Sequence, residues 1–133
     1  LTLLKSGEKI KKPIYNFKTH ERQANTNVIN PNTLIFVEGT LIFHFIELIN
    51  IINLKIFIET NESVRYQRRI SRDIKQRGRA ISNVKKQYQN TVKPMHVKYI
   101  EPLKSVADVI ISGELDIVDS ANSVIKKIDL LRK

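Results

Sequence analysis

Arginine is concentrated in one short stretch of this 133-residue chain. Seven of the fifteen residues from 65 to 79 are Arg or Lys, and Asp73 is the single acid among them. Written as a helix, this stretch places six positions on one face by i, i+3, i+4, i+7 spacing: 65, 68, 69, 72, 76 and 79. Arginine presents planar, bidentate donors that match phosphate oxygens, and it stays charged at physiological pH. The stretch therefore predicts a site for an anion, with a solvated basic helix as the alternative.

The composition narrows the class of anion only in part. The net charge of +10 favours nucleic acid, phosphorylated small molecules or acidic membranes, and a basic helix is also an electrostatic footprint for DNA or RNA. The chain has no cysteine, which excludes a disulfide scaffold and thiolate metal sites. Its longest apolar stretch, residues 41–54, is interrupted by His44, Glu47 and two asparagines, so we expect no membrane span. Without a basic and apolar leader, we expect a cytoplasmic protein.

Two further groups of residues could bind a ligand. Glu38 follows an apolar run and precedes Gly39, where a carboxylate at a strand end could reach a metal or a substrate hydroxyl. Its alternative role is to accept backbone hydrogen bonds at a helix start. Tyr15 and Phe17 stand at i, i+2 and would share one face of a strand, with His20 close by. They could hold a planar base and its polar edge, or pack a hairpin onto the core.

The surrounding pattern predicts an α/β fold. The predicted strands are a hairpin over residues 12–29 and three apolar runs, 33–37, 54–59 and 107–111. The predicted helices are the end of a helix at 1–7 with Gly7 as its cap, then 41–52, 62–76, 81–92 resuming after Pro94, and 119–131. In the last helix, an apolar face comprises Ala121, Val124, Ile125, Ile128 and Leu131. Strands that alternate with helices favour a parallel sheet flanked by helices in one domain, residues 1–133.

These residues resemble the uridine–cytidine kinase family, and bacterial uridine kinases in particular. The resemblance is carried by YNFKTHER (15–22), FVEGTLI (36–42), KIFI (55–58), RRISRDIKQRGR (68–79), QY (87–88), VKPM (92–95) and ADVII (107–111). It runs almost without gaps from Leu4 to Ile128. The chain departs from the family at Asn16 and Glu59, where aspartate is usual, and at Ser112, where proline is usual.

The resemblance implies an enzyme that transfers the γ-phosphoryl group of ATP (or GTP), with Mg²⁺, to the 5′-hydroxyl of uridine or cytidine. It implies a P-loop kinase-type parallel sheet with a β-hairpin over the nucleoside, an arginine-rich lid helix at residues 62–79, and a homo-oligomer, commonly a tetramer. The implied substrate-binding residues are Tyr15, Phe17, His20, Arg69, Arg79 and Gln87. Arg72 and Arg77 would lie over the triphosphate as catalytic groups, Glu38 near the metal, and Asp116 against ATP.

One family motif has no counterpart in the sequence. The phosphate-binding pattern G-x-x-x-x-G-K-[ST] occurs nowhere, because the four glycines, at positions 7, 39, 78 and 113, are too scattered. In the family, that loop and the general base both lie upstream. We therefore expect this chain to be the C-terminal portion of a uridine kinase, without its first strands and inactive by itself. The alternatives are a non-catalytic nucleoside-binding or subunit-interaction module and, less favoured, a basic nucleic-acid-binding domain.

Overall fold

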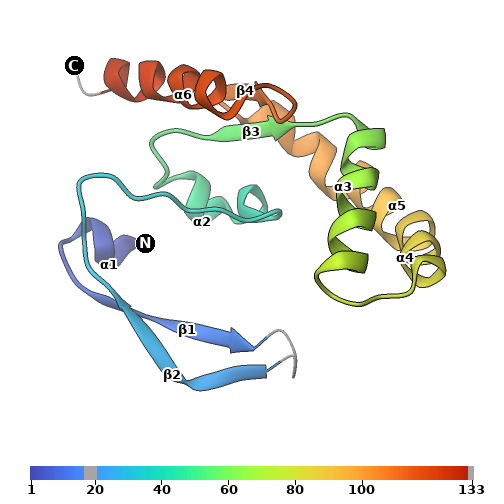
Figure 1. Cartoon of the computed structure of the whole chain (residues 1–133). Helices are drawn as coiled ribbons and strands as arrows, with labels where there is room; N and C mark the ends of the chain where they lie inside the picture. The colour runs from blue at the N-terminus through green and yellow to red at the C-terminus, as the bar shows by residue number, and fades with distance from the viewer. Residues whose placement is uncertain (17–20, 132–133) are drawn as a thin grey trace. The chain divides into compact units, whose positions relative to one another are not determined.

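The computed structural model describes residues 1–16 and 21–131 (Figure 1). Its contacts divide into two compact units, Leu1–Ile42 and Phe43–Lys133. The first unit contains a short helix and a hairpin, and the second contains a parallel strand pair with the helices that connect and cover it. Within the described residues, the structure has no helix long and apolar enough to cross a membrane.

The first helix, α1 (Thr2–Lys5), ends as its sequence predicts. Gly7 adopts a φ of +87°, which glycine reaches without the penalty that a Cβ atom would bring. This turn directs the N–H of Glu8 to the carbonyl of Leu3 at 2.8 Å and the N–H of Gly7 to that of Leu4 at 3.3 Å. The two hydrogen bonds form a Schellman motif, which satisfies carbonyls at the end of the helix. The predicted glycine cap is confirmed.

The hairpin predicted over residues 12–29 is also confirmed. Strands β1 (Ile10–Asn16) and β2 (Glu21–Ile29) pair antiparallel, from Ile10 opposite Ile29 to Asn16 opposite Glu21. A bulge between Pro13 and Tyr15 shifts the register, where Pro13 has no N–H to donate to the ladder. Phe17 and His20, predicted to contact a base, lie outside the described residues.

The strand predicted at residues 33–37 does not form. These residues are irregular, and the side chain of Phe36 is 73% exposed. An apolar, β-branched run becomes a strand only when a neighbouring strand supplies its hydrogen bonds, and no strand in the described part of the chain pairs with this run. The prediction was wrong because it was based on local composition, which does not indicate whether a pairing strand is present.

The second unit is built on two parallel strands, β3 (Ile56–Glu59) and β4 (Val109–Ser112). They pair from Ile56 opposite Val109 to Glu59 opposite Ser112, which confirms the second and third apolar runs as strands. Asp108 fastens the start of the pair, because its Oδ2 accepts the backbone N–H of Lys55 at 2.7 Å and the Lys55 ammonium at 3.0 Å. Both contacts lower the pKa of Asp108. The predicted α/β class is therefore confirmed.

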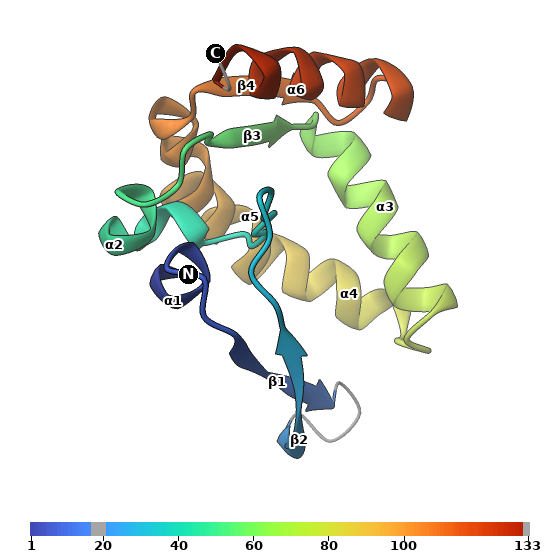
Figure 2. The same ribbon diagram turned by 90° about the vertical axis from the view of Figure 1, so that its left-hand side faces the viewer.

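A helical crossover joins these strands (Figures 1 and 2). It consists of α3 (Glu62–Lys75), α4 (Ile81–Gln87), the π-helical η2 (Tyr88–Val92), α5 (Lys93–Met95), the π-helical η3 (His96–Ile100) and the 3₁₀-helical η4 (Glu101–Val106). Pro94 lacks an N–H and would crowd a regular turn, and wider π-turns flank it. The remaining short helices are η1 (Ile42–His44) and α2 (Ile46–Ile49).

Two aromatic rings fix α3 against the start of η2. The rings of Tyr66 and Tyr88 lie 4.6 Å apart between centroids at a tilt of 54°. Tyr88 is buried, and Val84 one turn earlier is completely buried. This contact packs the Tyr66 ring of α3 against η2, whereas Ile74 of α3 remains exposed.

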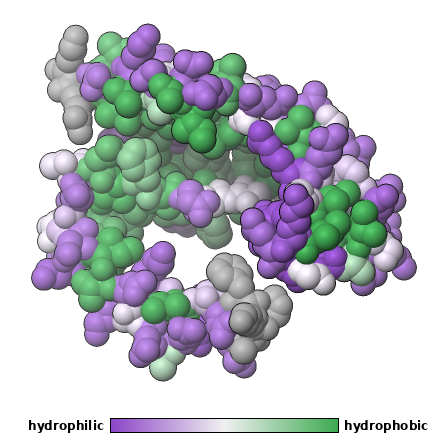
Figure 3. All heavy atoms as spheres, in the orientation of Figure 1, coloured by the Kyte–Doolittle hydropathy of each residue, from purple (hydrophilic) through white to green (hydrophobic). Residues whose placement is uncertain are grey.

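The last helix, α6 (Ile117–Leu131), lies along β4. The structure half-buries Val124 and Ile128 of the predicted apolar face and leaves Ile125 and Leu131 exposed. Apolar and polar side chains are therefore mixed on the surface of this unit (Figure 3).

Candidate functional site

The first two arginines of α3 attach the helix to the sheet. Asn61 caps α3 by accepting the N–H of Ser63, and its own N–H donates to Glu114 Oε1 at 2.7 Å. Arg65 donates from Nη1 to the carbonyl of Thr60 at 3.1 Å, and Arg68 to that of Gly113 at 2.9 Å. Gly113 fits closely here, because a Cβ atom on it would overlap the Thr60 hydroxyl. These contacts orient α3 relative to the ends of β3 and β4.

A glycine turn brings the last two arginines back to the helix. The helix predicted over residues 62–76 is confirmed as α3, which ends at Lys75, and the rest of the lid segment implied at 62–79 lies beyond this helix. Gly78 then adopts a φ of +61°, its N–H bonds the carbonyl of Ile74 at 3.2 Å, and the N–H of Arg79 bonds that of Asp73 at 3.0 Å. Arg79 therefore joins the cluster through this turn, and it does not lie on the helical face that its spacing predicted.

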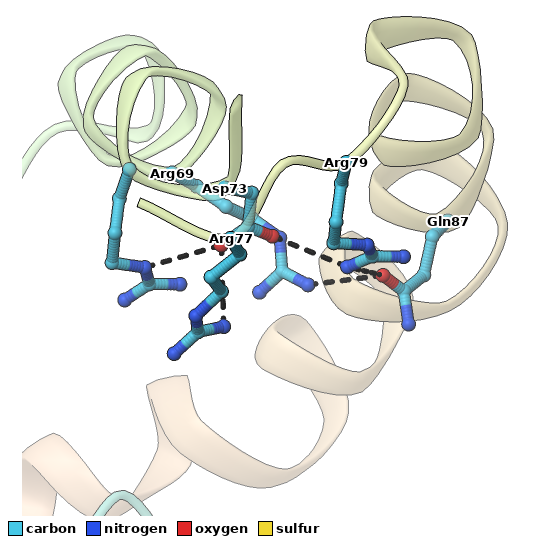
Figure 4. A network of polar contacts seen from close by, with 6 residues as sticks. Arg69, Asp73, Arg77, Arg79 and Gln87 are labelled. Carbon is cyan, nitrogen blue, oxygen red and sulfur yellow. Dashed lines mark hydrogen bonds and ion pairs between the residues drawn. The ribbon is translucent and has the colours of Figure 1, made fainter. Parts of the chain in front are cut away.

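Four arginines converge on the carboxylate of Asp73 (Figure 4). Its Oδ1 accepts from Arg72 Nε and from Arg77 Nη1, each at 3.2 Å. Its Oδ2 accepts from Arg79 Nη1 at 3.2 Å and lies 3.7 Å from Arg69 Nε. The Asp73 side chain is 0% exposed, although α3 also contains four arginines. We call these five residues the Asp73 cluster.

Gln87 links the cluster to α4. Its Oε1 accepts from Arg79 Nη1 at 2.9 Å and from Arg69 Nη2 at 3.1 Å (Figure 4). Arg69 and Arg79 are therefore each in contact with two acceptors, Asp73 and Gln87. Arg72 and Arg77 are the more exposed pair, with side chains 45% and 50% exposed. The cluster thus has a held pair and an outward-facing pair of guanidinium groups.

The electrostatics of the cluster explain why a carboxylate can be buried here. Burial by itself raises the pKa of Asp73, but the hydrogen bond from Arg72 and the charges of Arg69, Arg72 and Arg77 outweigh it. The net effect is a lowered pKa, so Asp73 stays ionised at neutral pH. It offsets part of the repulsion among the arginines, whose remaining donors can still face a ligand.

A cavity of about 500 Å³ adjoins this cluster. Its lining consists of the four arginines of α3, Gln76 at the end of that helix and three residues of the following helices: Arg65, Arg68, Arg69, Arg72, Gln76, Tyr88, Val92 and His96. Burial and the nearby charge of Arg65 lower the pKa of His96, against the opposing effect of Glu101 and Glu62. His96 is therefore neutral at pH 7, and arginine is the source of positive charge in this cavity.

A second cavity, of about 550 Å³, lies at the carboxyl ends of β3 and β4. Charged groups in its lining pair with one another, Lys93 with Glu62 at 2.8 Å and Lys104 with Glu59. None of the predicted site residues lines it. The Asp73 cluster is thus the better candidate site.

The other predicted site residues are not part of the cluster. Tyr15 lies in β1, opposite Arg22, and Glu38 is exposed in the irregular segment, both in the first unit. Asp116 precedes α6 and its Oδ1 accepts the N–H of Val118 at 2.7 Å, so it acts as an N-cap. No group of three metal-ligating side chains occurs among the residues described. A lone carboxylate such as Glu38 suits Mg²⁺ only where phosphate oxygens and water complete the coordination.

Sequence reasoning did not assign Asp73 a role. The signal was present, because Asp73 stands four residues after Arg69 and four before Arg77, where side chains on a helix meet. Its contact with Arg79 depends on the Gly78 turn, which spacing alone does not reveal.

Comparison with known proteins supplies an independent line of information. The sequence profile of the phosphoribulokinase/uridine kinase family matches residues 1–117. The chain is 47% identical to the uridine kinase of Clostridium novyi over 108 residues, covering 81% of this chain and 52% of the relative. It is 44% identical to that of Brevibacillus brevis over 108 residues, covering 81% and 50%. For Ligilactobacillus salivarius, the identity is 39% over 127 residues, covering 93% and 59%. The chain spans about half the length of these curated relatives.

Proposed function

We propose a nucleoside-kinase function for this chain, which belongs to the phosphoribulokinase/uridine kinase family. In this proposal, the chain contributes nucleoside- and phosphate-contacting residues to an enzyme that phosphorylates the 5′-hydroxyl of uridine or cytidine. ATP or GTP is the phosphoryl donor. The similarity to curated uridine kinases supports the reaction class, and the Asp73 cluster supports the assignment of residues.

The observation that carries the proposal is the convergence of Arg69, Arg72, Arg77, Arg79 and Gln87 around Asp73. The family resemblance implies substrate roles for the same five residues. Phosphoryl transfer depends mainly on positioning and on stabilising charge on phosphate oxygens, which guanidinium groups do well. We assign Arg72 and Arg77, the outward-facing pair, to the triphosphate, and Arg69, Arg79 and Gln87 to the nucleoside.

The base-contacting residues in this proposal are those that the family resemblance implies. Tyr15 and His20 contact the pyrimidine and Phe17 lines its pocket. Glu38 would hold Mg²⁺ together with the phosphates, where the ion would neutralise developing charge on the transferred group. Asp116 would approach ATP with the oxygen that does not cap α6.

The proposal also requires groups that these 133 residues lack. No phosphate-binding loop of the G-x-x-x-x-G-K-[ST] type is present in the sequence, so its backbone donors and lysine must come from other residues. The base that orients the 5′-hydroxyl must likewise come from elsewhere. We therefore expect no uridine phosphorylation by the 133-residue chain alone.

A chimera tests the proposal directly. This chain replaces the segment that it matches in the Clostridium novyi uridine kinase, so that the relative supplies the other half of the length. We expect the chimera to form UMP from uridine and ATP, measured by chromatography, and the 133-residue chain alone to form none above a mock preparation. An inactive but folded chimera would contradict the proposal. Uridine binding by such a chimera, measured by calorimetry, would instead favour a non-catalytic nucleoside-binding module.

A further inference from the structure

We propose that Asp73 is a positioning residue that sets the geometry of both arginine pairs through its two carboxylate oxygens. The inference rests on the proposed function, because it assigns those pairs to the nucleoside and to the triphosphate. It concerns a residue that touches neither substrate in our assignment.

The division of contacts between the two oxygens is the first argument. Oδ1 contacts Arg72 and Arg77, the pair assigned to phosphate, whereas Oδ2 contacts Arg69 and Arg79, the pair assigned to the nucleoside. One rigid carboxylate thus connects two binding functions. Its position on α3, which Tyr66 anchors to Tyr88, fixes both sets relative to the fold.

The Asp73 carboxylate is also completely buried. A buried charge is retained only where hydrogen bonds and opposite charges compensate for its loss of water. Arginine side chains at the surface remain hydrated without an acidic partner. The buried carboxylate beneath them therefore serves to order them. Arg77 and Arg79 come from the turn after α3, and the Asp73 carboxylate accepts a hydrogen bond from each of their side chains, while the backbone N–H of Arg79 donates to the main-chain carbonyl of Asp73. Asp73 therefore folds this turn onto the helix.

The two arginine pairs differ in how strongly they are restrained. Arg69 and Arg79 contact a second acceptor, Gln87, which restrains them further. Arg72 and Arg77 each contact Asp73, and both side chains are about half exposed. Loss of the Asp73 charge should therefore disorder Arg72 and Arg77 most, which lowers kcat. It should disorder Arg69 and Arg79 less, which raises the KM for uridine.

Substitution of Asp73 in the chimera tests this inference. Asp73→Asn keeps the size of the side chain but removes its charge, and we expect kcat/KM for uridine to fall by about 10–100-fold, with changes in both kcat and KM. Asp73→Glu keeps the charge and should recover part of the activity. The matched control is Asp108→Asn, which also breaks an aspartate ion pair but lies at the start of β4, and it should stay within about twofold of wild type. Circular dichroism confirms that each variant is folded.

A double-mutant cycle separates positioning from general destabilisation. If Arg79 acts through Asp73, the losses caused by Asp73→Asn and Arg79→Lys will be clearly less than multiplicative when combined. Multiplicative losses, or an Asp73→Asn variant within twofold of wild type, would overturn the inference.

A measurement on the 133-residue chain tests the role of Asp73 independently of the proposed function. We expect Nε–H exchange of Arg72, followed by ¹⁵N NMR, to be about tenfold faster in Asp73→Asn than in wild type, since the charged acceptor is lost. If the wild-type chimera is inactive, the proposed function fails, and the NMR result alone decides whether Asp73 orders the arginines. Unchanged exchange would overturn the inference whatever the activity of the chimera.

Discussion

Arg79 and Gln87 are joined by a 2.9 Å hydrogen bond from Nη1 to Oε1, which connects the turn after α3 to the end of α4. The same Gln87 oxygen also accepts from Arg69. A neutral amide between two cations holds them without cancelling their charge, so both guanidinium groups keep donors for a ligand. The relationship makes Gln87 a test of the nucleoside assignment.

We expect Gln87→Ala to raise the KM of the chimera for uridine by about tenfold, because two arginines lose a shared acceptor and the nucleoside loses an amide partner. The KM for ATP should change little. Gln89→Ala, an equally exposed glutamine two residues later in η2, is the control and should behave as wild type. Equal effects of the two substitutions would show that Gln87 has no specific function.

Arg72→Lys distinguishes a directed guanidinium from simple positive charge. The substitution keeps the charge but loses the planar fork, so we expect kcat in the chimera to fall by about 10–100-fold. Lys75→Ala is the control, because Lys75 is exposed at the end of α3, and a screened surface charge should change kcat less than about twofold. If the losses follow net charge alone, the cluster attracts anions without orienting them.

His20 is expected to form hydrogen bonds with the edge of the pyrimidine. This prediction rests on its position beside Tyr15 and Phe17 in the sequence and on the family resemblance. His20→Ala should lower kcat/KM for uridine. The corresponding loss of transition-state stabilisation is about 1–3 kcal/mol, the cost of leaving a polar partner unpaired. Steady-state kinetics with each substrate varied in turn measure the effect. A similar loss for ATP would indicate a structural role.

The lowered pKa of His96 predicts acid sensitivity of the fold. The unfolded chain has the ordinary histidine pKa, about 6.5, and binds a proton more readily than the folded chain does. Stability should therefore be complete above about pH 6.5 and decline as the pH falls from there towards the folded pKa. Urea unfolding between pH 5 and 8, followed by circular dichroism, measures this slope. His96→Gln should flatten it, and an unchanged slope would exclude His96 as its cause.

The sequence by itself determined most of the local elements. The Gly7 cap, the hairpin, α3, α6 and the strands β3 and β4 follow from periodicity, turn residues and apolar runs, which act over a few residues. The spacing of the arginines, with the family resemblance, also selected the residues that converge on one carboxylate.

Only the tertiary structure decided how those pieces are used. Residues 33–37 have the composition of a strand but none of the pairing, because strand formation requires hydrogen bonds from a distant segment. Arg79 reaches Asp73 through the positive φ of Gly78, off the helical face that spacing predicted. Two of the four arginines around the buried Asp73, Arg77 and Arg79, reach it only when the turn folds back onto α3. The folding of this turn onto α3 thus places the one acid of a basic stretch at the centre of the candidate site.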